Sequence, residues 1–232
     1  MVGNNSWKEL LNNRFNRHFG GTKHGVADRY ISGYFWVYWT DLPPKLQEYC
    51  GLSLTDISKV LTASCSAVTT IPAVTINKAT APGLGGVNYS YPSNVDIGNE
   101  FATRHDEFSG LPIYRILHGW TKMIRDMRGG TSNLTGDDYT KSQYSSTIFY
   151  WTTKPDGLTI EYCACYAGCF PNRPNEDAFA HDVGTNDLVS LETSWNVDVP
   201  YEMEDWVIQK CTSLANSIFA DRNTIYQRRE GV

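Results

Sequence analysis

The chain of 232 residues has no long hydrophobic run. No apolar stretch approaches the roughly 20 residues that are needed to cross a bilayer. The N-terminus, MVGNNSWKELLNNRFNRHFGG, is rich in Asn and has no apolar signal core before a small-residue cleavage site. The sequence therefore predicts no membrane-spanning segment, and we expect the protein to fold in the cytoplasm of the cell that makes it.

Positive charge is also in short supply. The chain has 20 Lys and Arg against 25 Asp and Glu, which gives a formal net charge of −5. Proteins that grip nucleic acid do so mainly with Lys and Arg, which neutralise phosphates. The composition therefore argues against a surface that holds nucleic acid tightly, although it suits a surface along which DNA slides.

Motifs for catalysis, metals and cofactors are missing as well. The five histidines are scattered, and His105, Asp106 and Glu107 are explained by the charge preference of a helix N-terminus. The cluster CACYAGC has gaps of one and three residues, whereas zinc knuckles usually have two. Gly83, Gly85 and Gly86 do not open a helix, as a phosphate-binding loop would. We expect no enzymatic activity, no cofactor, no metal site and mostly free thiols at Cys50, Cys65, Cys163, Cys165, Cys169 and Cys211.

The segment RHDEFSGLPIYRILHGWTKMIRDMRGG, residues 104–130, carries the clearest pattern that the chain has. Helical spacing places one apolar stripe on it, made of Ile113, Ile116, Leu117, Trp120, Ile124 and Met127, with Met123 alongside. Ser109 or Gly110 is a candidate cap, Pro112 suits the first turn, and two glycines supply the exit. The pattern predicts a helix over about residues 110–128 that needs a broad apolar partner.

Alternating and β-branched runs supply that partner. They predict strands at residues 30–40, 71–78, 95–104, 145–153, 158–166 and 188–199, with a hairpin through Lys154-Pro155-Asp156-Gly157. A short helix at 54–66, a long exposed loop at 79–94, a loop at 168–187 and a terminal helix at 202–222 complete the pattern. The predicted fold class is α+β, mainly an antiparallel β-barrel or sandwich with one central flanking helix and a C-terminal helix. The predicted parts are an N-terminal arm at 1–29, a β-domain at 30–200, and the last helix and tail at 201–232.

The order of several sequence segments is similar to their order in a known protein family. The strand ISGYFWVYW, the glycine loop before VDIGNEF, the segment from HDEF to MRGG, the hairpin YWTTKPDGLTIEY, GCFPNRPNEDAF and the strand ending in NVDV follow one another. Together they resemble the tail tube proteins of large contractile-tailed bacteriophages over most of residues 30–200. The resemblance implies a structural virion protein that forms hexameric rings, which stack into the inner tube and conduct DNA during ejection.

The same resemblance implies partners and a location. The partners are further copies of the chain, the sheath protein outside, the tape measure protein and viral DNA in the lumen, and the baseplate and tail terminator at the ends. The location is the virion tail, assembled in the host bacterial cytoplasm. The residues expected to contact the next ring are Pro82, Gly83, Leu84, Gly85, Gly86, Tyr89 and Tyr91.

The predicted central helix has a second face beside its apolar stripe. We expect this face, with Tyr114, Arg115, Lys122 and Asp126, to contact a neighbouring subunit. Two alternatives stay open: a ring-forming tube subunit of a contractile injection or secretion system, and a hydrolase or carbohydrate-binding β-domain that uses Tyr89, Tyr91 and Trp151.

Overall fold

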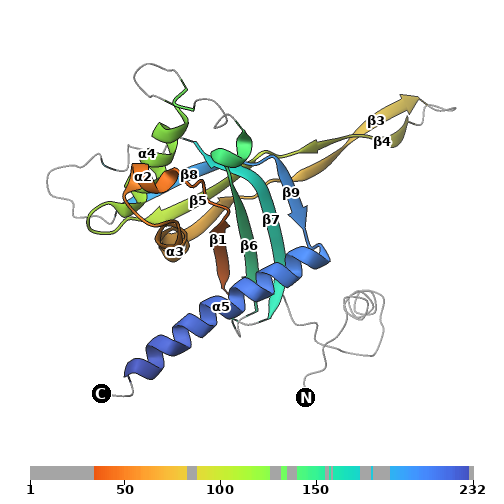
Figure 1. Ribbon diagram of the computed structural model, residues 1–232. Helices are drawn as coiled ribbons and strands as arrows, with labels where there is room; N and C mark the ends of the chain where they lie inside the picture. Colours follow the sequence, from red (N-terminus) through yellow and green to blue (C-terminus); the bar gives the residue numbers. More distant parts are fainter. Residues whose placement is uncertain are drawn as a thin grey trace, which may run out of the picture.

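The computed structural model describes residues 34–82, 88–125, 132–134, 140–154, 157, 159–172, 179 and 189–229, with side chains up to residue 218. Seven strands form two antiparallel sheets that share one strand (Figure 1). One sheet contains β1 (Phe35–Thr40), β6 (Ser146–Thr153), β7 (Ile160–Pro171) and β9 (Val199–Glu202). The other contains β2 (Cys65–Thr70), β5 (Glu100–Asp106), β8 (Ser190–Asn196) and the end of β7. The α+β prediction is confirmed, with the sheets arranged as a sandwich and no closed barrel among the described strands.

The strand β7 belongs to both sheets because it bends near Gly168. Residues 164–167 of β7 pair with β9, while Phe170 and Pro171 pair with β8. Gly168 has φ +70, and a Cβ there would lie 2.9 Å from Cγ of Asp198. Glycine is the residue that adopts this left-handed conformation without strain, so it lets the strand change direction at an irregularity of the pairing.

The main core lies between the two sheets and under the helices α3 (Leu54–Ser64) and α4 (Pro112–Ile124). Trp39 of β1, Trp195 of β8 and Trp120 of α4 are fully buried, and the ring of Trp195 lies 5.5 Å from each of the other two. The predicted stripe is confirmed at Ile113, Ile116, Leu117, Trp120 and Met123, which are all buried. Ile124 is half-buried, and Met127 lies outside the described residues.

The helix α4 is shorter than predicted at both ends, and its cap differs. Leu111 precedes it with φ 57, and neither Ser109 nor Gly110 provides a side-chain cap. Instead, the Glu107 carboxylate accepts hydrogen bonds from the backbone N–H groups of Ile113, at 3.1 Å, and Tyr114, at 2.8 Å. These N–H groups have no partner inside the first helical turn. The acidic residue ahead of the helix therefore satisfies its N-terminus.

The terminal helix α5 (Asp205–Arg229) covers the outer face of β6 and β7, and runs beyond the body in Figure 1. Beneath it lies a second core of Phe149, Trp151, Cys163, Cys165, Val207, Cys211 and Ala215. The sequence pattern assigned a single apolar face to residues 158–166. That prediction was incomplete, because Cys163 and Cys165 point to the opposite face and are buried there under α5.

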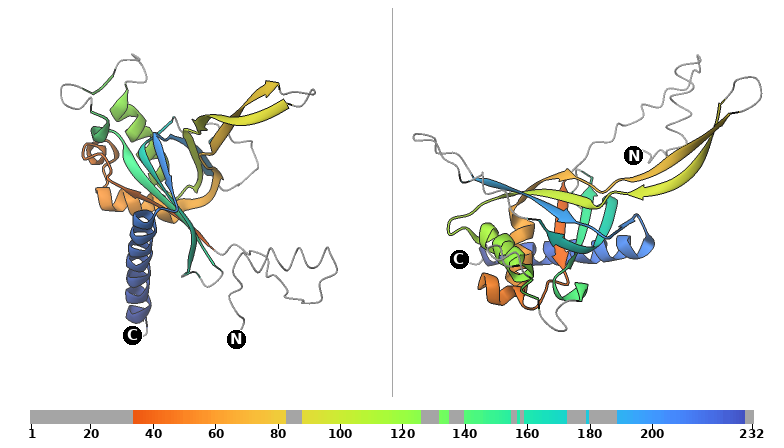
Figure 2. Two further views of the ribbon diagram at one scale, coloured as in Figure 1. Left: turned by 90° about the vertical axis from the view of Figure 1, so that its right-hand side faces the viewer. Right: turned by 90° about the horizontal axis from the view of Figure 1, so that it is seen from above.

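The described residues of the stretch 79–94, which are 79–82 and 88–94, are not a loop. They belong largely to a two-stranded ribbon, β3 (Val74–Pro82) and β4 (Asn88–Ile97), which projects from the body (Figures 1 and 2). Every residue of both strands is exposed, so no alternation between buried and exposed faces marks them in the sequence. The prolines at 82 and 92 favoured a loop in the sequence analysis. In the structure, Pro82 ends β3 and Pro92 lies beside an irregularity of the strand pairing.

Other boundaries also differ from the prediction, among them the end of α3, both ends of β3 and both ends of α5. The run 95–104 is split by Gly98 and Asn99 between β4 and β5, and the run 188–199 is split between β8 and β9. The strand β7 continues to Pro171, through residues that were assigned to a loop. A five-residue helix, α2 (Leu46–Cys50), had no counterpart in the prediction. The arm at 1–29 lies outside the described residues, and the three-part division of the chain stays a prediction.

Candidate interaction surfaces

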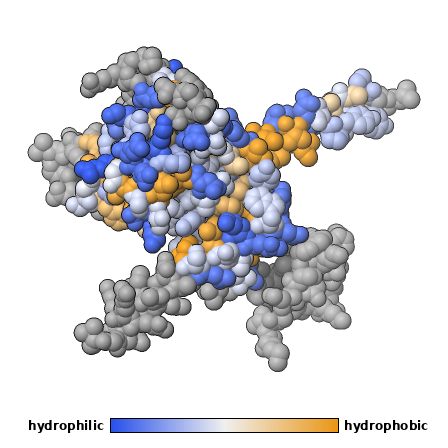
Figure 3. All heavy atoms as spheres, viewed as in Figure 1, coloured by the Kyte–Doolittle hydropathy of each residue, from blue (hydrophilic) through white to orange (hydrophobic). Residues whose placement is uncertain are grey.

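The ribbon β3–β4 carries apolar side chains that its own chain leaves uncovered. Val74 pairs with Ile97 and Ile76 pairs with Val95, so these four side chains share one face at the base of the ribbon. Each is more than half exposed. Figure 3 shows them as a hydrophobic band where the ribbon leaves the body. We call this set the ribbon patch.

The predicted inter-ring residues lie toward the tip of the ribbon. Pro82 ends β3, and Tyr89 and Tyr91 lie on β4 opposite Ala81 and Ala79. The two tyrosines share a face and are 53% and 56% exposed. Gly83, Leu84, Gly85 and Gly86 lie outside the described residues.

A second surface is the groove between α2 and α4, with a volume of about 540 Å³. The two helices approach closely here because Gly119 has no side chain. A Cβ at Gly119 would lie 2.9 Å from Sγ of Cys50 and 3.3 Å from the carbonyl oxygen of Tyr49. The groove is lined by Glu48, Tyr49, Cys50, Gly51, Tyr114, Arg115, His118, Gly119 and Lys122. Burial raises the pKa of the Cys50 thiol to about 11, so this thiol stays protonated and uncharged at neutral pH.

The α4 wall of this groove is basic. Arg115, His118 and Lys122 follow one another at helical spacing and all face the groove, while Glu48 is the single acidic residue of its lining. Arg115 and Lys122 are exposed and form no ion pair with the described residues. His118 stacks on Tyr114 with ring centroids 5.3 Å apart, and its buried Nδ1 has no hydrogen-bond partner in the described part of the chain.

The structure therefore brings three of the predicted helix-face residues, Tyr114, Arg115 and Lys122, to one groove. The fourth, Asp126, lies outside the described residues. The α2 wall, with Glu48 and Tyr49, was missed by sequence reasoning. Its only advance signal is the Pro43-Pro44 pair, which ends β1 and precedes a helix too short to show periodicity.

A third surface lies where β9 turns into α5. Residues 202–206, which we call the β9–α5 corner, contain the exposed acids Glu202, Glu204 and Asp205 beside the exposed Met203 and Trp206. The Trp206 indole N–H donates to Oε2 of Glu204 at 2.6 Å, and the indole ring meets the ring of Tyr201 edge-on.

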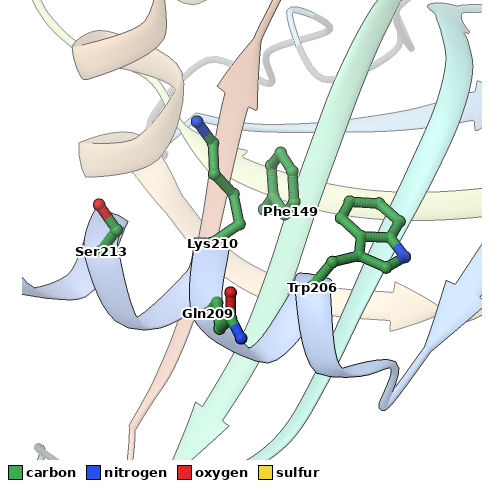
Figure 4. A pocket seen from close by; sticks show the side chains of 5 residues that line it. All are labelled: Phe149, Trp206, Gln209, Lys210 and Ser213. Atoms are coloured by element: carbon green, nitrogen blue, oxygen red, sulfur yellow. The ribbon is translucent and has the colours of Figure 1, made fainter.

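A shallow pocket of about 360 Å³ adjoins this corner along α5. Figure 4 shows Phe149 between Lys210 and Trp206, with Gln209 and Ser213 completing the lining. The aromatic ring of Phe149 thus lies beside Trp206, and Lys210 lies on the far side of Phe149. The pocket extends the apolar part of the corner toward the body of the sandwich.

The Ser64 hydroxyl lies 2.9 Å from Nδ1 of the His105 imidazole, but this contact is inside the core. Both residues are almost completely buried, and Thr103 occupies the other ring nitrogen of His105, also at 2.9 Å. No substrate can reach this pair while the fold is intact, so its role is structural. Trp151, which the carbohydrate-binding alternative required at the surface, is fully buried beneath α5, so that site is wrong as proposed.

Two classes of feature are missing from the described part of the chain. It contains no helix that is both long and apolar enough to span a bilayer. In the same residues, no three His, Cys, Asp or Glu side chains gather in a way that would hold a metal ion. All six cysteines are free, and Cys163, Cys165, Cys169 and Cys211 are buried.

No protein-family model and no curated protein matches the chain. Among solved structures, the chain is similar to one in an extracellular contractile injection system, "PVC sheath/tube terminator in extended state", at a TM-score of 0.49 and 13% identity over 78% of this chain and 100% of that one. It is also similar to a chain in the "PVC sheath-tube complex in extended state", at a TM-score of 0.49 and 13% identity over 77% of this chain and 93% of that one.

A third similar chain belongs to the anti-feeding prophage cap, described as the "AFP tube terminating cap", at a TM-score of 0.49 and 11% identity over 78% of this chain and 95% of that one.

Proposed function

We propose that this protein is a non-enzymatic subunit of the tube of a contractile, phage-tail-like machine, in which copies form rings and the rings stack. The observation that carries the proposal is the exposed ribbon β3–β4. An isolated two-stranded ribbon is marginally stable in water at best. This one projects from the body with its apolar side chains uncovered, which indicates that another surface covers it.

The energy available from the ribbon patch is substantial. Its four side chains are 52–64% exposed. Covering the exposed half of each is worth roughly 1 kcal/mol, taking about half the value for burying a whole aliphatic side chain. One ribbon therefore contributes a few kcal/mol, and a ring adds this contribution once for each subunit. Many equal, modest contacts suit a long and regular tube.

The ordered sequence phrases support the same proposal from a separate direction. They resemble those of tail tube proteins over most of residues 30–200, a span that includes the ribbon, α4 and the hairpin of β6 and β7. In this proposal the sheath lies outside the tube, a tape measure protein passes through it, and the baseplate and terminator close its ends. The particle is assembled in the cytoplasm of a bacterial host.

The ribbon is tested by making its patch polar. In the variant V74T/I76T/V95T/I97T the side chains stay β-branched or short, so the strands keep their backbone preference. We expect a protomer with wild-type circular dichroism and melting temperature that no longer forms stacked tubes in electron micrographs. The matched control is T75N/T80N, which changes exposed ribbon residues outside the patch.

The proposal predicts tubes for the wild type and for the control. Stacked tubes from the quadruple variant would remove the ribbon from the contact. A wild-type protein that stays monodisperse at high concentration, without rings or tubes, would refute the proposed function itself.

The cargo is a separate part of the proposal. A net charge of −5 suits a lumen along which DNA moves without adhering, as in a phage tail. A tube of an injection machine that carries protein effectors has the same architectural requirements. Particles treated with nuclease and then opened distinguish the two: protected DNA supports the phage tail, and protected protein without nucleic acid supports the injection machine.

A further inference from the structure

We propose that the groove between α2 and α4 binds the β9–α5 corner of a second copy of this chain. The inference rests on the proposed function, because it names the lateral contact within a ring. It commits to one occupant, and the case for that occupant is complementarity of charge and of apolar surface between two patches of the same molecule.

The groove offers positive charge in an otherwise acidic protein. Arg115 and Lys122 are exposed on its α4 wall, with His118 between them. The two cationic residues are seven positions apart on the helix, which places them roughly 10 Å apart along its axis. A single bound anion would engage one of them, whereas a segment with several carboxylates engages both.

The β9–α5 corner supplies such a segment. Glu202, Glu204 and Asp205 are exposed within four consecutive positions. The segment turns at Met203 and enters α5 at Asp205, so its span is less than the roughly 10 Å of an extended chain of this length, and the long side chains of Arg115 and Lys122 cover the difference. An Arg guanidinium binds a carboxylate with two parallel hydrogen bonds, so Arg115 gives the contact direction as well as attraction.

The apolar parts of the two patches also correspond. Tyr49 is 41% exposed at the rim of the groove, and Tyr114 lines it. At the corner, Met203 and Trp206 are 47% and 45% exposed. The Met203 sulfur accepts a hydrogen bond from the backbone N–H of Cys163 at 3.3 Å, which fixes the side chain at the corner while about half of it stays exposed. Aromatic and thioether side chains that meet at the centre of a contact commonly supply much of its binding energy.

The two patches cannot meet within one chain. In Figure 1 and in the view from above in Figure 2, α2 and α4 lie on one side of the sandwich and the start of α5 lies on the other. A contact between different patches on opposite sides is heterologous, and repeating it closes a ring when the rotation allows. This is the symmetry that a ring-forming subunit needs.

The test uses two variants, each with one of the two patches disabled by charge reversal. The variant R115E/K122E has a disabled groove and an intact corner, while E204K/D205K has an intact groove and a disabled corner. Each alone should show at least tenfold weaker self-association than the wild type by sedimentation velocity, because like charges now face each other. Mixed in equal amounts, the two variants offer opposite charges in both pairings, the intact groove with the intact corner and the reversed groove with the reversed corner, so we expect mixed oligomers in which the variants alternate. K59E, on the exposed side of α3, is the matched control and should associate like the wild type.

The outcomes separate this inference from the proposed function. A mixed oligomer that contains both variants and weakens as salt is raised supports the contact, whether or not tubes form. Wild-type rings and tubes together with wild-type association of R115E/K122E would overturn the inference and leave the proposed function standing. An equimolar mixture with no mixed oligomer, at concentrations where the wild type associates, would also overturn it. Circular dichroism of each variant verifies that reversal has not unfolded the protomer.

Discussion

Acidification should destabilise this protein through one buried side chain, His105. The imidazole is fully buried between α3 and β5, and its ring lies 5.6 Å from that of Trp39. Burial lowers the pKa of His105 from 6.5 to about 4, and the nearby Asp106 offsets only part of this effect. The folded protein therefore holds His105 neutral at a pH where the unfolded chain already binds a proton.

The hydrogen bonds around His105 specify which neutral form is present. The Trp195 indole N–H donates to the Thr103 hydroxyl at 2.9 Å, which leaves the Thr103 proton for Nε2 of His105. At the other end, the Ser64 hydroxyl donates to the carbonyl oxygen of Leu61 and so accepts from Nδ1–H. Every donor and acceptor among Trp195, Thr103, His105 and Ser64 has a partner only when the imidazole carries a single proton, on Nδ1. A second proton on Nε2 would oppose the hydroxyl proton of Thr103.

The size and direction of the effect follow from the pKa. The pKa of His105 is lower in the folded protein than in the unfolded chain. The stability that the neutral imidazole contributes is therefore fully present above pH 6.5 and is lost as the pH falls from 6.5 toward 4. Below pH 4 this group causes no further loss of stability. The lowering corresponds to about 3 kcal/mol in total, of which about 2 kcal/mol is lost by pH 5. That is a large share of the 5–15 kcal/mol that typically stabilises a domain.

Urea denaturation at pH 8, 7, 6 and 5, followed by tryptophan fluorescence at concentrations too low for assembly, measures this loss. Other groups also titrate in this range, so the informative quantity is the difference between the wild type and H105Q. Gln is neutral, and its amide can accept from Thr103 and donate to Ser64 as the imidazole does. We expect H105Q to be less stable at pH 8 but to lose about 2 kcal/mol less than the wild type between pH 8 and pH 5. Parallel pH curves for the wild type and H105Q would refute the reasoning.

Two further predictions concern α4. Replacing Glu107 with Gln keeps the shape of the side chain but removes the negative charge that faces three backbone N–H donors, those of Phe108, Ile113 and Tyr114. We expect this change to lower the free energy of unfolding, measured by urea denaturation, by about 1 kcal/mol. The exposed E100Q is its control, and equal stability of the two variants would show that Glu107 is not a cap. G119A should cost about 1–3 kcal/mol because its Cβ collides with the α2 helix, and adding C50A should restore part of that loss by removing the nearest atom, Sγ of Cys50. A G119A protein as stable as the wild type would mean that the two helices separate freely.

Sequence reasoning succeeded where one face of an element is buried. The stripe of α4 and the hairpin of β6 and β7 follow directly from periodicity and turn chemistry, and both are present in the structure. The helix α5 was predicted as well, but the surface that it covers was not, because that surface is made partly of Cys163 and Cys165. Small sulfur side chains alternating with Thr159 and Glu161 resemble a solvent face, although free cysteine packs as a small hydrophobic residue.

The candidate site was predictable only in part, for a related reason. Arg115 and Lys122 were identified because they lie on the side of α4 away from its stripe, which any regular helix reveals. Their opposite wall, Glu48 and Tyr49, belongs to a five-residue helix that is placed by tertiary packing rather than by its own pattern. The ribbon was read as a loop because both of its faces are exposed, so that its pairing depends on cross-strand contacts that no single strand shows.

The two proposed contacts draw on different forces, and this difference orders them in assembly. The groove and the β9–α5 corner carry opposite charges, which attract over about a Debye length and orient two copies before they touch. The ribbon patch has no comparable charge, since its four members are aliphatic, and it gains free energy only once another surface covers it. Lateral pairing is therefore favoured between free copies, whereas stacking becomes favourable when a ring presents several ribbons at once. A single ribbon worth a few kcal/mol holds a lone subunit weakly, but a whole ring of them holds its neighbour firmly.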